Sequence, residues 1–324
     1  MGNIHQISFS DEDYKKAAEK WKRELLLMPL LACKDTLKYM TGMPGVRNAL
    51  HLGTAEGQAQ FAPYRSDRKS ANTTDVKFRT LRTFFGNASE DFDPNAYITT
   101  LLGENAAFLG DGQAKAPSAK LVLACVAKSL GAHLNDALFT AKRNGEGNTT
   151  QDLFDGWNTI ADAEITSGQI SVSNGNLLEL DDVIDSSNAV DVAKMIERSA
   201  DPHLRKLDKF LFCDPAFADA YNDNYLLTHS GISYNTKFNQ AFVEGSNNKT
   251  TIVPLDCLAG TDKYFLTPKS NMLYGYDSMS DVEKVIVERF SPWVLTFAAA
   301  MFFGTEFHSV DKRFLQIVKL KSAE

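Results

Sequence analysis

A periodic apolar pattern marks residues 117–143 as the longest predicted helix. Leu121, Ala124 and Leu138 share one broad side of a helix with 3.6 residues per turn. Pro117 suits the first helical turn, and Asn144-Gly145 suits its end. At about 1.5 Å per residue this helix is about 40 Å long. The pattern therefore predicts a helix that runs the length of a domain.

A different pattern, strict alternation, appears before this helix. Val76-Lys77-Phe78-Arg79 alternates apolar and basic residues, which is typical of a strand with one face exposed. Phe61-Ala-Pro-Tyr64 is the predicted partner strand, with residues 65–75 as the turn. We therefore predict a long two-stranded β-hairpin within residues 49–95.

The C-terminal part contains a second predicted hairpin. A strand at Tyr264–Thr267 leads into the turn sequence Thr-Pro-Lys-Ser-Asn, and Met272–Tyr276, interrupted by Gly275, follows as a second strand. Residues 293–303 form the longest apolar run, which is too short to span a bilayer. We expect this run to be a buried strand or helix.

Between these segments the pattern mixes helices and strands. Residues 189–196 begin an amphipathic helix, and Asp201-Pro begins a turn or short helix. Residues 209–213 read as a strand, and Asp214-Pro215 starts a helix through Tyr221 because proline suits the first turn. Residues 251–255 are extended. With the helix and hairpin above, this order predicts an α+β fold with an α/β body over residues 152–320.

The N-terminal part is predicted to be a helical arm over residues 10–40, interrupted by Pro29. Its leucines, Leu26 and Leu30 among them, are too dense for an arm surrounded by solvent. They require a cover, either from the same domain or from a neighbouring subunit.

Composition limits the class of protein. The chain has 324 residues, of which 44% are hydrophobic and 23% charged, enough for one sizeable core or two smaller ones. Its net charge of −7 argues against a protein that wraps nucleic acid. No secretory signal precedes the arm, so we expect folding in a cytoplasm and no membrane partner. The four cysteines, Cys33, Cys125, Cys213 and Cys257, are widely spaced and are expected to be small buried apolar residues.

Charge is distributed unevenly along the chain. Between Arg47 and Gly86 there are seven Lys or Arg and three Asp or Glu, a net charge of +4, and the remaining 27 and 38 give −11. Such asymmetry suits docking of the hairpin on an identical neighbour, although the charge pattern alone favours the simpler interpretation, a solvated hairpin with a basic bias. The predicted intersubunit contacts are Arg65, Arg68, Lys69, Arg79, Arg82, Leu26 and Leu30.

Sequence motifs do not support an enzyme. Gly103–Gly112 lacks the lysine and hydroxyl of a phosphate-binding loop, and the six histidines lack zinc-site spacing. The acidic segment 179–182 could bind a metal, but charge runs usually face water. We therefore predict no catalytic, cofactor-binding or metal-binding residues.

The string Leu266-Thr-Pro-Lys-Ser-Asn-Met-Leu-Tyr-Gly275 resembles a segment near the C-terminus of tailed-phage major capsid proteins, which have the Hong Kong 97 fold. The segments Phe154-Asp-Gly156 and Phe212–Tyr221 also resemble this family, and the order of elements agrees with it. The resemblance implies an N-terminal arm (1–48), an extended loop (49–95), a peripheral domain with a spine helix (96–150), an axial domain (151–275) and return strands to the peripheral domain (276–324).

By this resemblance the chain would be a shell subunit that forms hexamers and pentamers around double-stranded DNA without reading its sequence. It would be assembled in the host bacterial cytoplasm and located in the virion. Portal, scaffolding and decoration proteins would be possible partners. The alternatives are an encapsulin-like nanocompartment shell and, in a different class, an α/β enzyme of unknown chemistry.

Overall fold

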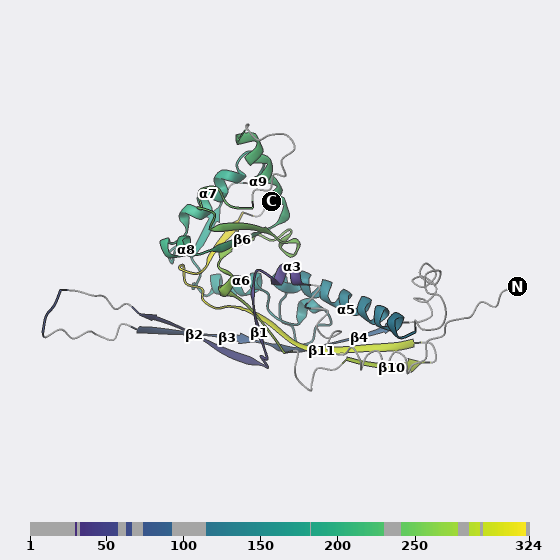
Figure 1. Cartoon of the computed structure of the whole chain (residues 1–324). Helices are drawn as coiled ribbons and strands as arrows, with labels where there is room; N and C mark the ends of the chain where they lie inside the picture. Colours follow the sequence, from purple (N-terminus) through teal and green to yellow (C-terminus); the bar gives the residue numbers. More distant parts are fainter. Residues whose placement is uncertain are drawn as a thin grey trace.

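The computed structural model describes residues 30, 33–57, 63–66, 74–92, 115–181, 183–229, 241–277, 285–291 and 294–321. Helices and strands are mixed throughout these residues, as predicted for an α+β protein. An α/β part stands on a long, flat layer of strands, and a narrow ribbon of two strands leaves that layer at one end (Figure 1). The predicted arm helices before Leu30 lie outside the described residues.

The flat layer is a five-stranded sheet built on one long strand. This strand, β11 (Val294–Phe307), pairs with β10 (Val285–Ser291), β4 (Phe84–Phe92) and β9 (Met272–Asp277), and β9 pairs in parallel with β1 (Thr41–Pro44). The predicted apolar run is therefore a strand, with Phe297, Phe303 and Phe307 fully buried.

The α/β part contains a second five-stranded sheet. Its strands lie in the order β5 (Leu177–Leu180), β12 (Gln316–Leu320), β8 (Lys263–Thr267), β6 (Lys209–Cys213) and β7 (Thr250–Pro254). Helices α7 (Ala189–Ser199), α8 (Pro202–Lys206) and α9 (Pro215–Thr228) accompany it. The predicted helix starts at Asp201-Pro and Asp214-Pro are confirmed, and the Asp214 carboxylate accepts a hydrogen bond from the Phe217 amide at 2.9 Å.

This second sheet is buried on both faces because successive side chains of a strand point to opposite sides. Leu211 packs with α7 and α9 in one core, whereas Phe212 packs with Phe139 and Phe303 in the other. The long helix α5 (Lys115–Thr140) and helix α6 (Trp157–Thr166) contribute to this second core, with the Phe139 and Trp157 rings 5.2 Å apart. Helix α5 confirms the predicted long helix, although it ends at Thr140 rather than Arg143. Both layers thus share the core in which α5 lies.

The predicted hairpin of residues 264–276 is wrong. Strand β8 belongs to the second sheet and β9 to the first, so the Thr-Pro-Lys-Ser-Asn segment carries the chain from one sheet to the other. Asn271 fixes this crossing from a buried position: its side chain donates to Thr267 Oγ1 at 3.0 Å and accepts from the Ser309 amide at 2.8 Å. A turn-forming sequence therefore serves here as a connection between layers.

The first predicted hairpin exists, but with a different partner strand. Strand β3 (Thr74–Arg82) pairs with β2 (Ala49–Gly57), so Val76 lies opposite Ala55. The predicted partner strand, Phe61–Tyr64, lies in part outside the described residues. Residues 84–92, placed in the loop by the sequence, are β4 of the flat sheet. Strand β12, expected among the return strands, instead joins the α/β sheet. Cys33, Cys213 and Cys257 are buried as predicted, but Cys125 is exposed.

Candidate subunit-contact region

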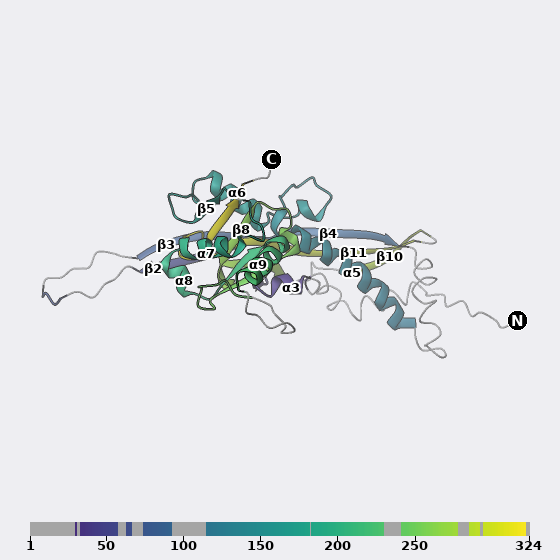
Figure 2. The same cartoon turned by 90° about the horizontal axis from the view of Figure 1, so that it is seen from above.

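The ribbon formed by β2 and β3 pairs with no other strand among the described residues. Both views show these strands leading away from the rest of the chain (Figures 1 and 2). An isolated two-stranded ribbon is marginally stable in water, so its base requires support from the body.

Close backbone contact provides part of this support. The end of β3 crosses β11 at Gly304, where an added Cβ atom would lie 2.0 Å from the Arg82 carbonyl oxygen. At Gly275 of β9 an added Cβ atom would lie 2.7 Å from the Thr83 side chain. The two glycines therefore permit the ribbon base to lie directly on the flat sheet.

A largely but not fully buried ion network ties β3 to the body. The Arg79 guanidinium is only 18% exposed, and its Nη2 lies 2.7 Å from Oε1 of both Glu164 and Glu306. Its Nε donates to the Phe307 carbonyl at 3.1 Å. Burial raises the pKa of Glu306, and the charge of Arg79 opposes this rise. Helix α6 and strand β11 thus hold the ribbon through one arginine.

A second charged group lies beside this network. Lys77 Nζ is 3.5 Å from Asp311 Oδ2, and Arg313 binds both oxygens of Asp311 at 3.0 Å. Hydrogen bonding from the Arg313 side chain holds the pKa of Asp311 well below its ordinary value. Because Lys77 is largely exposed, its own contribution is screened by solvent.

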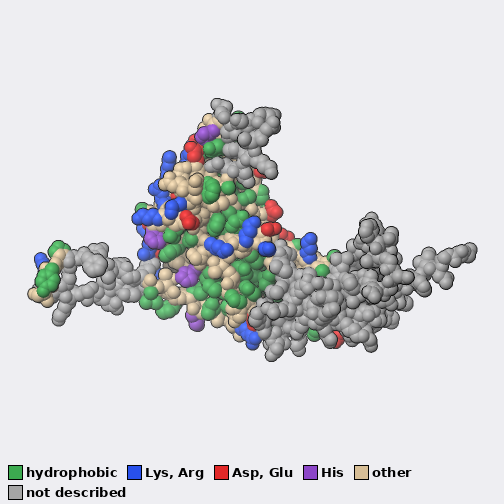
Figure 3. Space-filling view, viewed as in Figure 1, with side chains coloured by type: hydrophobic (Ala, Val, Ile, Leu, Met, Phe, Trp, Pro, Cys, Tyr) green, Lys and Arg blue, Asp and Glu red, His purple; other side chains and the backbone are tan. Residues whose placement is uncertain are grey.

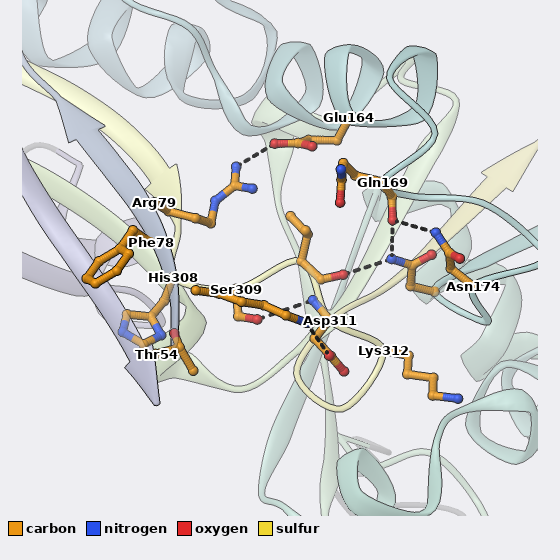
Figure 4. Close-up of a pocket in the computed structure, with 13 residues that line it drawn as sticks. Thr54, Phe78, Arg79, Glu164, Gln169, Asn174, His308, Ser309, Asp311 and Lys312 are labelled. Atoms are coloured by element: carbon orange, nitrogen blue, oxygen red, sulfur yellow. Dashed lines mark hydrogen bonds and ion pairs between the residues drawn. The ribbon is translucent and has the colours of Figure 1, made fainter. Parts of the chain in front are cut away.

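A polar cleft of about 730 Å³ lies between the ribbon base, the end of α6 and the 308–312 segment. Figure 4 shows Arg79 pointing toward Glu164, with Asp311 among the other side chains that line the cleft. The remaining lining includes Gln169, Asn174 and His308. The cleft therefore includes Lys77, Arg79, Glu164 and Asp311, four of the side chains in these ion pairs.

The outer face of the ribbon carries two exposed apolar side chains. Val76 is 50% exposed and Phe78 is 72% exposed, and they lie opposite Ala55 and Gly53 in the register. The Phe78 ring covers the position where Gly53 lacks a side chain. This surface can take part in apolar contact with another chain.

The predicted contact residues differ in their exposure and in their partners. Arg65 and Arg82 are exposed, whereas Leu30 is partly buried against the chain's own core. For Arg79, the expectation that it contacts a neighbour rather than its own body is wrong, because Glu164 and Glu306 neutralise it within the chain. Arg68, Lys69 and Leu26 lie outside the described residues.

Sequence reasoning missed the acidic partners of the ribbon and the exposed position of Phe78. Glu306 is 227 residues from Arg79, so no local spacing relates them. The alternation Val76-Lys77-Phe78-Arg79 did contain a signal, since it puts two apolar side chains on the face opposite Arg79. Which of the two faces meets the body was decided by tertiary structure.

Comparison with solved structures identifies the fold. No family model and no curated protein matches the sequence. A chain of the satellite phage P4 procapsid, solved with its size determination (Sid) protein, is 11% identical with a TM-score of 0.57, and the match covers 92% of this chain and 91% of that one. The capsid of a native GTA particle matches at 11% identity and TM-score 0.52, covering 90% and 91% of the two chains.

A third capsid, that of cyanophage A-1(L), matches at 11% identity and TM-score 0.52, over 90% of this chain and 92% of that one. These matches extend over nearly the whole length of both partners. The fold of this chain is therefore that of phage capsid proteins, as the resemblance of its element order implied.

Metal binding and membrane crossing are two further possibilities for the described residues. No group of three or more His, Cys, Asp or Glu side chains in these ranges is arranged to hold a metal ion. No helix within them is long and apolar enough to cross a bilayer.

Proposed function

We propose that this chain is the structural subunit of an icosahedral phage head, assembling into hexamers and pentamers that enclose double-stranded DNA. The observation that carries this proposal is the capsid fold, matched over 92% of this chain by the P4 procapsid chain. The matched capsids favour this function over an encapsulin-like shell or an α/β enzyme.

Within this proposal the segments take the roles that the resemblance implied. Residues 1–48 form an arm, the ribbon is the core of an extended loop, and α5 is the spine helix of a peripheral domain. Residues 151–275 then correspond to an axial domain, from which the chain returns to the peripheral domain. Assembly in the host cytoplasm and a final location in the virion follow from the same function. Portal, scaffolding and decoration proteins would be its further partners.

The ribbon is the proposed contact between neighbouring subunits. It extends beyond its own body, carries exposed Arg65 and Arg82, and presents Phe78 and Val76 on its outer face. A second copy offers an acidic surface, because the chain outside residues 47–86 has a net charge of −11, from 27 basic and 38 acidic residues. Arg68, Lys69 and Leu26 belong to the same proposed contact, whereas Arg79 serves as the anchor that holds the ribbon in place.

Electron microscopy and sedimentation of the purified full-length chain test this function. Closed shells or regular capsomers are expected, since exposed apolar and charged surface on every copy favours repeated association. A monodisperse monomer at high concentration, under all assembly conditions, would contradict the proposal.

A further inference from the structure

A group of cations lies at one edge of the α/β sheet, where the parallel strands β5, β6, β7 and β12 begin. We call this surface the α8 patch and define it as Arg198, Arg205, Lys206 and Lys249. Figure 3 shows Lys and Arg side chains gathered along this edge of the molecule, over α7 and α8. The patch stands out because the chain as a whole carries a net charge of −7.

One hydrogen bond, one ion pair and the order of the helices bring these cations to the same edge. Lys249 Nζ donates to the carbonyl oxygen of Lys206 at 2.6 Å, which fixes the lysine at the last turn of α8. Arg205 Nε lies 4.0 Å from Glu197 Oε1, beside the buried Lys209. Arg198 lies in the last turn of α7, which α8 follows almost directly. Three separate segments of the chain thus bring positive charge to one edge.

The carboxylates near the patch do not neutralise it. The Glu197 carboxylate is buried. Its Oε1 accepts a hydrogen bond from Lys209 Nζ at 3.1 Å, and its Oε2 accepts one from the Thr250 hydroxyl at 2.7 Å. Asp201 caps α8 by accepting from the His203 amide. Asp208 is the exposed carboxylate of this segment, and it lies 3.8 Å from Lys249. Arg198 and Lys206 have no ion-pair partner among the described residues. The patch with Lys209 has five cations against the three carboxylates of Glu197, Asp201 and Asp208, so it keeps a net charge of +2.

The chemistry around the patch favours a nucleic acid over a protein partner. Residues 197–209 and 245–249 contain none of the large exposed hydrophobic side chains found elsewhere on the described surface, and the one nearest in sequence is Met195, one turn before Arg198 on α7. Protein interfaces have an apolar core within a polar rim, whereas contacts to a phosphate backbone need mainly Lys and Arg. The exposed apolar residues instead lie on segments such as the ribbon, at Val76 and Phe78.

We propose that the α8 patch is a contact site for the phosphate backbone of double-stranded DNA, bound without regard to base sequence. The choice of DNA as the polyanion rests on the proposed function as a head subunit. The positive charge of the patch, in contrast, follows from the arrangement of these side chains and does not depend on the proposed function. The patch would give a shell of acidic subunits a defined place to meet packaged DNA.

The test uses the full-length protein and fluorescein-labelled 30-base-pair duplexes of two unrelated sequences. Fluorescence anisotropy is measured over a series of NaCl concentrations. Both duplexes are expected to bind equally, with an affinity that falls steeply with salt. The variant carries Arg198→Gln, Lys206→Gln and Lys249→Gln. Because each lost phosphate contact removes about 0.9 from the slope of log affinity against log salt, a decrease of about 2–3 and an affinity loss of at least about tenfold at low salt are expected.

The matched control replaces three exposed lysines outside the patch by glutamine: Lys34, Lys142 and Lys321. Its total charge equals that of the variant, and its DNA affinity is expected to exceed the variant's by at least about fivefold. Circular dichroism shows that both remain folded. Equal losses in the variant and the control, or no binding by the natural chain at low salt, would overturn the proposal.

Sedimentation and microscopy of the same proteins separate this inference from the proposed function. Shells that form normally from a chain that does not bind DNA would reject the patch and leave the head subunit standing. DNA binding through the patch without any assembly would reject the shell function and leave the patch. Loss of assembly with unchanged DNA binding in the variant would show that the patch contacts a second copy, which also overturns the proposal.

Discussion

At the scale of single residues, Arg79 decides how the ribbon meets the body. Its guanidinium forms ion pairs with two carboxylates from distant elements, Glu164 on α6 and Glu306 on β11. Removing a partner from a largely buried ion network leaves charge without compensation, which is more costly than losing an exposed pair. The stability of the ribbon base therefore depends on this side chain far more than on its exposed neighbours.

Replacing Arg79 by alanine is expected to lower the free energy of unfolding by about 3 kcal/mol, the lower end for a broken buried ion pair. Arg82→Ala, at an exposed position of the same strand, is the control and is expected to change it by less than about 0.5 kcal/mol. Urea unfolding of unassembled chains measures both. Equal effects of the two substitutions would show that the network does not anchor the ribbon.

The two carboxylates of the anchor region give opposite dependences of stability on pH. The folded-state pKa of Asp311 is lowered, chiefly by hydrogen bonding from Arg313, so its stabilisation is present above its unfolded pKa of about 3.9 and is lost as pH falls. The stability advantage of the natural chain over Asp311→Asn should therefore be larger at pH 7 than at pH 3.

For Glu306 the dependence of stability on pH has the opposite sign, because burial raises its folded-state pKa. The proton it binds in the folded state favours folding below its unfolded pKa of about 4.3, and this contribution is lost as pH rises through the folded value. Relative to Glu306→Gln, the natural chain should lose stability from pH 4 to pH 7. Parallel pH profiles of the two variants would contradict both assignments.

At the scale of elements, glycine positions allow the ribbon to cross the flat sheet. An added Cβ at Gly304 would lie 2.0 Å from a backbone carbonyl, which cannot move aside as a flexible side chain can. The crossing is thus a packing constraint on β11 itself, separate from the ion network. It explains why a glycine follows Phe302 and Phe303 in this 14-residue strand.

Gly304→Ala is expected to reduce the free energy of unfolding by about 3 kcal/mol, the upper part of the range for overpacking. Gly145→Ala is the matched control, because an added Cβ there meets only a side-chain atom at 3.9 Å. Thermal unfolding followed by circular dichroism compares the two. A Gly304 variant as stable as its control would mean that β3 does not lie against β11.

At the scale of the whole molecule, the ribbon and the body differ in charge and in exposure. Arg65 at the described tip and Arg82 near the base are exposed, whereas the body is acidic. Each exposed ion pair contributes only about 0.2–1 kcal/mol, but the proposed shell would repeat the contact on every subunit. Small contacts of this kind can therefore govern assembly without governing the stability of one chain.

Reversing Arg65, Arg68 and Lys69 to glutamate is expected to leave the subunit folded and to impair assembly. The charge-preserving variant Arg65→Lys, Arg68→Lys, Lys69→Arg is the control and should form normal shells. Circular dichroism measures folding and electron microscopy measures assembly. Normal shells from the reversed variant would refute the contact, and a collapsed fold would show that these residues pack on their own domain.

Much of the local structure followed from the sequence alone. Apolar periodicity and Pro117 predicted α5, and the Asp-Pro pairs predicted the starts of α8 and α9, because capping and helical periodicity depend on neighbours within one or two turns. Alternation predicted β3, and the order of elements resembled the capsid fold that the solved structures share. These signals act over short stretches, so they can be read from the chain directly.

Tertiary structure decided which elements pair and which charges meet. The segment after Thr267 has the residues of a hairpin turn, yet Asn271 carries it into another sheet by bonding to Thr267 and Ser309. Arg79 was assigned to a neighbour on its charge alone, whereas Glu164 and Glu306 reach it only once α6 and β11 have packed. Strand pairing and burial bring together residues that are hundreds of positions apart in the sequence. Neither composition nor local spacing indicates which of these distant residues will meet.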